Sequence, residues 1–291
     1  MCSSDLIPLT LLAMTGPFLA RLMTSNLRNV GGQVGMLSGL STLGSVAGTP
    51  LIGYFLLPLF SNTAILCGVA AILAALSCTY FACWHRSASS TVPLAAAAIG
   101  LAGLTLGAVR SDRLADNPDA VERFRGNSNF GLLQVIDSRH GPMRACLNDL
   151  LTQNTYDTAS GRSLSLFTYM LHGLARGYST NLQSALCIGL GVGIVPRLLA
   201  ADGATVDAVE INPAVPALAE RFFDFHPTNV HVTIGDGRQF LNAPGRRYDT
   251  IILDAYLGDG SPVHLMTVEA FQAMKRRLEP GGTLVINSFC R

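Results

Sequence analysis

The first third of the sequence has almost no charge. Between Leu6 and Val109 the only formally charged side chains are Arg21, Arg28 and Arg86, and none is acidic. Charged residues make up 13% of the whole chain, against roughly 25% in a typical soluble chain. Carboxylates inside a membrane usually mark ion-coupled transport. Their absence from this region argues against a transporter.

Lysine and paired cysteines are also scarce. Lys275 is the single lysine, and the seven cysteines form no C-x-x-C pair. A scattered, odd-numbered set of cysteines predicts buried free thiols, with no disulfide framework and no zinc site. The formal net charge of +1 gives no electrostatic case for nucleic-acid binding. We therefore expect neither a metal nor a nucleic-acid partner.

The first third of the chain consists largely of apolar stretches. Four of them are candidate membrane-spanning helices by length: Leu6–Leu22, Val30–Phe60, Asn62–Trp84 and Val92–Val109. We expect residues 1–110 to form a multi-pass membrane domain of about four helices. Residues 111–126 are expected to be a polar linker, and 127–291 a soluble domain. The arginines are too evenly divided between the two sides for the positive-inside rule to give the orientation.

Residues 185–210 have the pattern of a nucleotide-binding βαβ unit. Two apolar strands, Ala185–Ile188 and Thr205–Val209, flank a predicted helix at Ile194–Ala201. Strands continue to alternate with helices up to a last strand at Thr283–Asn287. This order predicts a doubly wound, Rossmann-like parallel sheet with helices on both faces. The chain ends soon after that strand, so we expect a C-terminal truncation and further strands beyond it, and the first residues, M-C-S-S-D, resemble a sequencing adapter.

A smaller β appendage is expected before this sheet. Phe130–Asp137 and Pro142–Asn148 read as two strands joined by a turn, and Leu164–Arg176 reads as a helix.

Polar residues and glycines are predicted where the strands of the parallel sheet end. The set comprises Gly189, Gly191, Gly193, Glu210, Asp236, Gly237 and Asp254. Ligands bind beyond the carboxyl ends of such strands, where glycines allow close approach and an acid can accept hydrogen bonds from ribose. We therefore expect a nucleoside site at this edge.

Two acids in this set have alternative interpretations. Asp236 suits either an adenine amino group or a helix N-cap. Asp254 could orient an amine or accept its proton, or it could tie down a loop. The loop after it carries candidate substrate contacts at Tyr256, Asp259 and His264.

Five motifs of the soluble domain resemble the spermidine/spermine synthase family, in its membrane-fused bacterial form. They are I-G-L-G-V-G, A-V-E-I-N-P, G-D-G-R-Q-F-L, Y-D-T-I-I-L-D-A-Y and L-E-P-G-G-T-L-V-I-N. The resemblance implies a class I methyltransferase-type fold and transfer of an aminopropyl group from decarboxylated S-adenosylmethionine to a polyamine. It also implies a bacterial inner-membrane protein with a cytoplasmic soluble domain, and it is compatible with a homodimer.

The resemblance also implies residue roles. The three glycines would lie against the nucleoside, Glu210 would hold the ribose, and Asp236 with Gly237 would hold the adenine. Asp254 would act on the attacking amine. Gln153, near the motif L-N-D-L-L-T-Q, and Tyr169 would complete the cofactor site.

The sequence departs from the family pattern at three places. Val192 and Leu257 replace acids, and Phe130-Gly131 replaces Tyr-Gln. A cationic substrate needs nearby carboxylates, so two alternatives stay open. One is an S-adenosylmethionine-dependent methyltransferase. The other is a non-catalytic domain that senses a nucleoside or a polyamine and regulates the membrane part.

Overall fold

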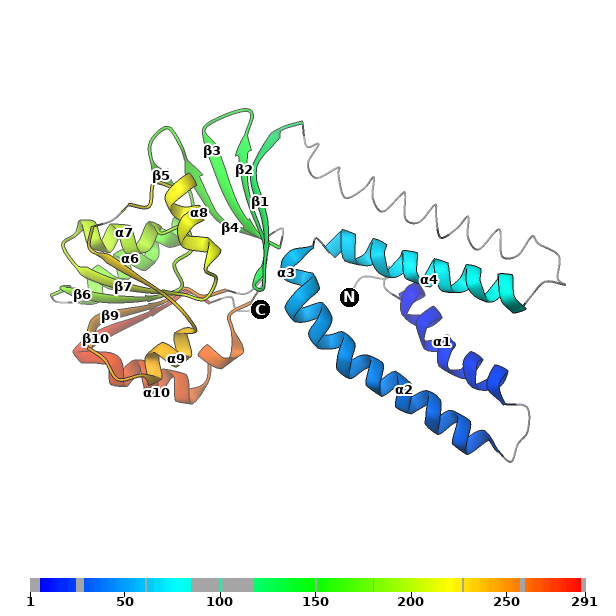
Figure 1. Ribbon diagram of the computed structural model, residues 1–291. Coiled ribbons are helices and arrows are strands. Elements are labelled where there is room, and N and C mark those ends of the chain that lie inside the picture. The colour runs from blue at the N-terminus through cyan, green and yellow to red at the C-terminus, as the bar shows by residue number, and fades with distance from the viewer. Residues whose placement is uncertain are drawn as a thin grey trace. The chain divides into compact units, whose positions relative to one another are not determined.

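The computed structural model (Figure 1) describes residues 6–24, 29–60, 62–84, 100, 118–149, 151–179, 181–226, 228–256 and 260–288. By its contacts the chain divides into two compact units, Met1–Leu57 and Pro58–Arg291. The second unit contains both the expected β appendage and the expected parallel sheet.

The N-terminal unit is helical. Helix α1 (Leu6–Met23) contacts α2 (Val30–Pro50). After Pro50 the chain continues as a π-helical segment, η3 (Leu51–Leu56), and then as α3 (Leu57–Leu59). Proline has no backbone N–H to donate to the preceding turn, so a local change of helix type is expected there. Helix α4 (Asn62–Trp84) follows in the second unit.

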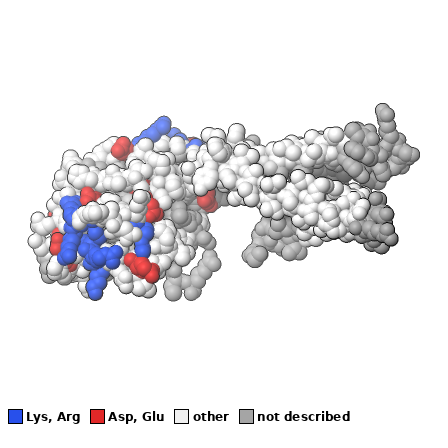
Figure 2. Space-filling view, turned by 60° about the horizontal axis from the view of Figure 1, so that its bottom comes forward, with Lys and Arg blue, Asp and Glu red and all other residues white. Residues whose placement is uncertain are grey.

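One helical stretch among the described residues, Val30–Leu59, is long and apolar enough to cross a membrane, and Ala64–Thr79 is a shorter apolar helix. Figure 2 shows the helical part without charged side chains on the face in view. Of the four expected spans, Val92–Val109 lies outside the described residues apart from Gly100. Several membrane-spanning helices therefore remain a prediction.

The β appendage is a five-stranded antiparallel sheet, larger than the sequence predicted. Its strands are β1 (Ala120–Ser128), β2 (Gly131–Ser138), β3 (Met143–Asn148), β4 (Leu151–Asp157) and β5 (Arg162–Ser163), paired in that order. We call it the appendage sheet. Residues 120–126 were predicted as linker and instead belong to β1. Their sequence, A-V-E-R-F-R-G, has three charged residues among seven, and pairing with β2 makes it a strand.

The predicted parallel sheet is confirmed. Its strands are β6 (Ser184–Ile188), β7 (Thr205–Glu210), β8 (Val230–Ile234), β9 (Tyr248–Leu253) and β10 (Leu278–Ile286), in the spatial order β10-β9-β6-β7-β8. The chain runs outward from β6 to β8 and then crosses back to place β9 on the other side of β6. The ends of β6 and β9 thus form the switch point at which such sheets bind ligands.

Helices cover both faces of this sheet (Figure 1): α6 (Leu166–Tyr178), α7 (Ile194–Ala201), α8 (Ala214–Phe222), α9 (Gly237–Asn242) and α10 (Val268–Arg277). Strand β6 shows why. Ala185 and Cys187 belong to one core cluster and Leu186 and Ile188 to the other. Successive side chains of a strand point to opposite faces, so an unbroken apolar run needs helices on both.

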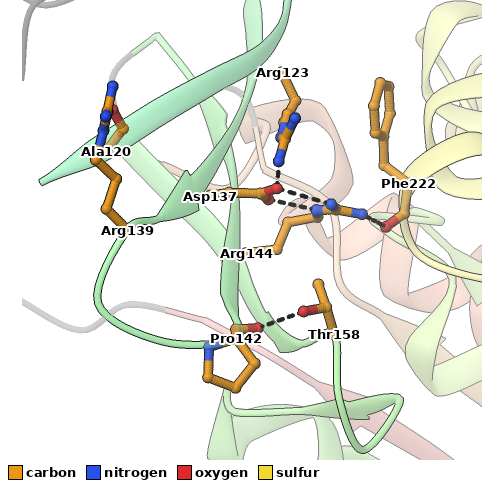
Figure 3. A network of polar contacts seen from close by, with 8 residues as sticks. All are labelled: Ala120, Arg123, Asp137, Arg139, Pro142, Arg144, Thr158 and Phe222. Carbon is orange, nitrogen blue, oxygen red and sulfur yellow. Dashed lines mark hydrogen bonds and ion pairs between the residues drawn. The ribbon is translucent and has the colours of Figure 1, made fainter.

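A polar network joins the appendage sheet to α8 (Figure 3). Arg144 on β3 donates two hydrogen bonds to the Asp137 carboxylate, at 2.6 and 2.9 Å, and a third to the Phe222 carbonyl at 2.7 Å. Arg123 bonds the same carboxylate at 2.7 Å. The hydrogen bonds from Arg144 lower the pKa of Asp137. One planar guanidinium thus bonds a carboxylate of the appendage sheet and, through its third donor, a carbonyl of α8, which ties the sheet to the α/β domain.

Candidate functional site

A cavity of about 820 Å³ lies at the carboxyl edge of the parallel sheet. The ends of β6, β7, β8 and β9 all contribute to it, as the sequence predicted. The appendage sheet closes one side, with residues of β2, β3 and β4 in the lining. The predicted site residues that line it are Gly189, Gly191, Glu210, Asp236, Gly237, Asp254, Gln153, Tyr256 and His264.

The glycine turn, Gly189–Gly193, combines two functions. Gly189 has φ 98°, and a Cβ added there would overlap the carbonyl oxygen of Asp254. Gly191 lines the cavity, with open space where a Cβ would stand. The first glycine therefore lets β6 and β9 end close together, and the second leaves room for a ligand.

Gly193 was predicted to contact the nucleoside, but it is not among the residues that line the cavity. It adopts the left-handed conformation at the start of α7, and a Cβ there would overlap the ring of Phe225. Its role is packing beneath the turn.

Glu210 ends β7 and ties that strand to the glycine turn. Its Oε2 accepts a hydrogen bond from the Leu190 amide at 3.0 Å, and its Oε1 accepts one from the Asn212 amide at 2.9 Å. Burial raises the pKa of this carboxyl, and the backbone amides oppose that shift. Ionised carboxylates offer about four acceptor positions, so Glu210 can hold the turn and still accept hydroxyl groups from a ligand.

Asp236 caps α9, with its Oδ1 accepting from the Gln239 amide at 2.8 Å. The helix-cap alternative is thus confirmed. The other carboxylate oxygen lies 3.0 Å from Nε2 of His264, which η4 (Val263–Leu265) positions. Asp236, Gly237 and His264 all line the cavity. The cap therefore fixes the Asp236 side chain at the cavity edge rather than removing it from the site.

Asp254 follows β9 at the switch point. Its Oδ1 accepts a hydrogen bond from Nδ2 of Asn287 at 2.9 Å. Burial raises the pKa of the Asp254 carboxyl, while the bond from Asn287 lowers it. Tyr256 lines the cavity beside it, and burial raises the pKa of its hydroxyl. Asp259 and Leu257 lie outside the described residues. A buried carboxylate with one oxygen held by an amide is well suited to taking up a proton.

The two N-terminal candidates have different outcomes. Gln153 lies on β4 and lines the cavity. Tyr169 does not line the cavity, although its neighbours Phe167 and Thr168 do. Its ring is 39% exposed, and its hydroxyl donates to the Ser163 carbonyl at 3.0 Å. Successive helical residues are rotated by about 100°, so the buried Thr168 leaves Tyr169 on an outer face of α6.

Four asparagines in the lining were not singled out from the sequence: Asn148, Asn154, Asn212 and Asn287. Asn212 donates to Ser128 Oγ at 3.0 Å and so ties the loop after β7 to the appendage sheet. The sequence pattern could have identified Asn287, because this residue follows an apolar strand that ends at the same edge as Asp254. No sequence pattern identifies Asn148, because its position depends on the antiparallel pairing of β3.

Comparison with known proteins finds similarities within this domain. Residues 185–282 match the family described as "Methyltransferase domain". The chain is 44% identical over 113 residues to a polyamine aminopropyltransferase of Vibrio vulnificus, covering 37% of this chain and 38% of that protein. It is 36% identical over 121 residues to an N-terminal histidine N-methyltransferase of Emericella nidulans, covering 40% of this chain and 21% of that protein.

A solved structure of a probable spermidine synthase from Corynebacterium glutamicum has a TM-score of 0.48 and 20% identity, covering 57% of this chain and 62% of that one. The chain spans less than half of the length of the curated relatives it matches here. The matched part of the chain is thus similar to methyltransferase domains and to part of the polyamine aminopropyltransferases.

Proposed function

We propose that the protein is an aminopropyltransferase that uses decarboxylated S-adenosylmethionine as donor and a polyamine or another small amine as acceptor. The observation that carries this proposal is the charge of the cavity. Glu210, Asp236 and Asp254 line it, and the described lining residues include no lysine or arginine. An acidic lining suits a donor whose sulfonium and ammonium groups are both positive. The carboxylate of intact S-adenosylmethionine would find no cationic partner among these residues.

The donor would lie along the carboxyl edge of the sheet. Gly189 and Gly191 would allow the nucleoside close to the backbone, Glu210 would accept hydrogen bonds from the ribose hydroxyls, and Asp236 with Gly237 would face the adenine. Gln153 would contact the donor from β4. Tyr256 and His264 line the same cavity and would contact the acceptor, and Asp259, which lies between them in the sequence, is proposed for the same role.

Asp254 would act as the base. The lone pair of the acceptor amine attacks the propyl carbon bonded to the sulfonium, and the carbon–sulfur bond breaks with its electrons going to sulfur. Methylthioadenosine leaves as a neutral thioether. The new secondary ammonium then gives one proton to the Asp254 carboxylate. The hydrogen bond from Asn287 holds one oxygen and leaves the other for this proton.

The pH dependence of turnover should reveal this arrangement. The pKa of Asp254 is raised by burial and lowered by Asn287, and the base must be ionised. The rate should therefore fall as the pH drops through a pKa above that of an ordinary aspartate. Asn287→Leu removes the hydrogen bond that stabilises the carboxylate, so the acidic limb of the pH–rate profile should move to higher pH. An unchanged limb would exclude Asn287 as the partner that sets this pKa.

The membrane assignment is part of the same proposal. We propose that residues 1–110 anchor the enzyme as a multi-pass domain, with the soluble domain in the cytoplasm. The apolar stretch Val30–Leu59 and the shorter apolar helix Ala64–Thr79 support it. Release of the full chain from membranes by alkaline carbonate would contradict it. The homodimer remains a prediction that light scattering can test.

A methyltransferase is the second candidate, because residues 185–282 match a methyltransferase-domain family. Calorimetric binding to the full chain decides between the two. Tighter binding of decarboxylated S-adenosylmethionine than of S-adenosylmethionine supports aminopropyl transfer. The reverse preference supports methyl transfer. Nucleoside binding without turnover of any amine would favour the sensing alternative.

A further inference from the structure

His264 holds one carboxylate oxygen of Asp236 at the edge of the cavity. Nε2 of His264 lies 3.0 Å from Oδ2 of Asp236. An ionised carboxylate can only accept hydrogen bonds, so Nε2 is the protonated nitrogen of the ring and donates this one. Oδ1 of the same carboxylate accepts from the Gln239 amide at 2.8 Å. Each oxygen of Asp236 thus has a different donor, one in α9 and one in η4.

The segment that carries His264 is held on two sides. Leu265, the next residue, is only 3% exposed and packs in the core cluster that contains Ile188 of β6. The carbonyl of His264 accepts a long hydrogen bond, 3.5 Å, from Nη1 of Arg238 in α9. The backbone of His264 is therefore fixed relative to α9, which is the helix that Asp236 caps.

A ligand can reach this pair of side chains. The side chain of His264 is 46% exposed and that of Asp236 is 34% exposed, and both residues line the cavity. An ionised carboxylate offers about four acceptor positions, and the bonds from Gln239 and His264 use two of them. Asp236 can therefore accept a further hydrogen bond from a ligand without losing either donor.

The second donor matters because the cap alone leaves Asp236 some freedom. The last torsion of an aspartate side chain has a broad preference, so a bond to Oδ1 does not by itself fix the direction of Oδ2. The bond from His264 does. A polar group that is already oriented costs less to order when a ligand binds, so His264 should strengthen any hydrogen bond that a ligand donates to Oδ2.

We propose that His264 is a positioning residue that orients Oδ2 of Asp236 to accept a hydrogen bond from the exocyclic amino group of adenine. This inference rests on the nucleoside binding that is part of the proposed function, and it adds to the acceptor contact proposed above for His264. The amino group is a donor and the carboxylate an acceptor. The pair of side chains therefore selects a 6-aminopurine over a purine that lacks this amino group.

The test is His264→Ala in the full chain, with calorimetric Kd values for methylthioadenosine and for its analogue without the 6-amino group. The unmodified protein should bind methylthioadenosine roughly tenfold more tightly than the analogue. His264→Ala should reduce this preference roughly three- to fivefold, by weakening methylthioadenosine alone. His264→Gln should restore the preference, because the glutamine Nε2 can donate to the same oxygen.

His172→Ala is the matched control. Nε2 of His172 lies 2.6 Å from Oδ2 of Asp202, which is a pair of the same kind, and neither residue lines the cavity. This substitution should leave both Kd values unchanged.

Three results with His264→Ala would overturn the inference and leave the proposed function in place. They are an equal change in both nucleosides, tighter binding of methylthioadenosine, and a rise in the KM of putrescine with both Kd values unchanged. If the unmodified protein binds neither nucleoside, the proposed function fails and this inference fails with it.

Discussion

Asp254→Asn should lower kcat for aminopropyl transfer by about a hundredfold or more, because a positioned general base contributes on the order of 10²–10⁴ to a rate. The Kd of the nucleoside should change by less than about threefold. The asparagine is nearly the same size, and its oxygen can still accept the hydrogen bond from Asn287 that the carboxylate accepts at 2.9 Å. Single-turnover kinetics with saturating donor, together with calorimetry, would measure the two effects separately.

Asp249→Asn is the matched control for this substitution. Asp249 lies near the opposite end of the same strand, β9, and does not line the cavity. Its Oδ2 accepts hydrogen bonds from the Gln183 and Ser184 amides at 3.0 and 2.8 Å. Its loss should lower stability and leave kcat of the folded protein unchanged. If Asp254→Asn weakened nucleoside binding as much as turnover, the residue would be structural and another base would be needed.

Gly189→Ala should destabilise the soluble domain by roughly 3 kcal/mol, from backbone strain and overpacking together. The residue has φ 98°, which disfavours any side chain, and the new methyl group would overlap the backbone oxygen of Asp254. Because a backbone atom cannot rotate away, β6 and β9 would have to separate at their ends. Turnover should be lost along with stability, since the same movement displaces the base.

Gly191→Ala separates the two effects. Its φ of 55° makes alanine mildly unfavourable, but nothing lies within 4 Å of the added Cβ. The cost in folding free energy should be about 1 kcal/mol. Because Gly191 lines the cavity, we expect the methyl group to weaken nucleoside binding much more than stability. Thermal unfolding and calorimetry of both variants would test this contrast. Equal destabilisation by the two substitutions would contradict the different roles assigned to these glycines.

The substitutions of Asp254 and Gly189 test different parts of the same junction between β6 and β9. Asp254 supplies its side chain to the cavity, while its backbone carbonyl needs the missing side chain of Gly189. The backbone amide of Asp254 also donates to the Ile188 carbonyl at 2.9 Å. The position of the proposed base and the stability of the fold are therefore coupled where β6 meets β9, which is the switch point of the sheet.

The α/β domain could be predicted from the sequence because its signals are local. Apolar runs such as Leu186–Ile188 can be buried only in a sheet covered on both faces, and the order of strands and helices then implies parallel pairing. The carboxyl ends of parallel strands share one edge, so Glu210, Asp236 and Asp254 were expected together before their distances were known. The lining of one cavity by all three confirms that expectation.

The appendage sheet and part of the site could not be predicted in this way. β1 carries few apolar residues, and β4 and β5 have no clear pattern, so long-range pairing alone makes them strands. Tyr169 is absent from the cavity lining because another face of α6 packs inward. Gly193 is absent from it because this residue packs against the ring of Phe225 beneath the turn.

Residue types and their order along the chain thus determined the fold class, the edge of the sheet that forms the site, and its acidic character. The tertiary structure alone decided which side chains reach the cavity and where a hydrogen-bonding atom such as Asn148 Oδ1 lacks a partner. The physical reason is that burial and hydrogen bonding depend on neighbours distant in sequence, whereas periodicity and turn chemistry depend on neighbours along the chain.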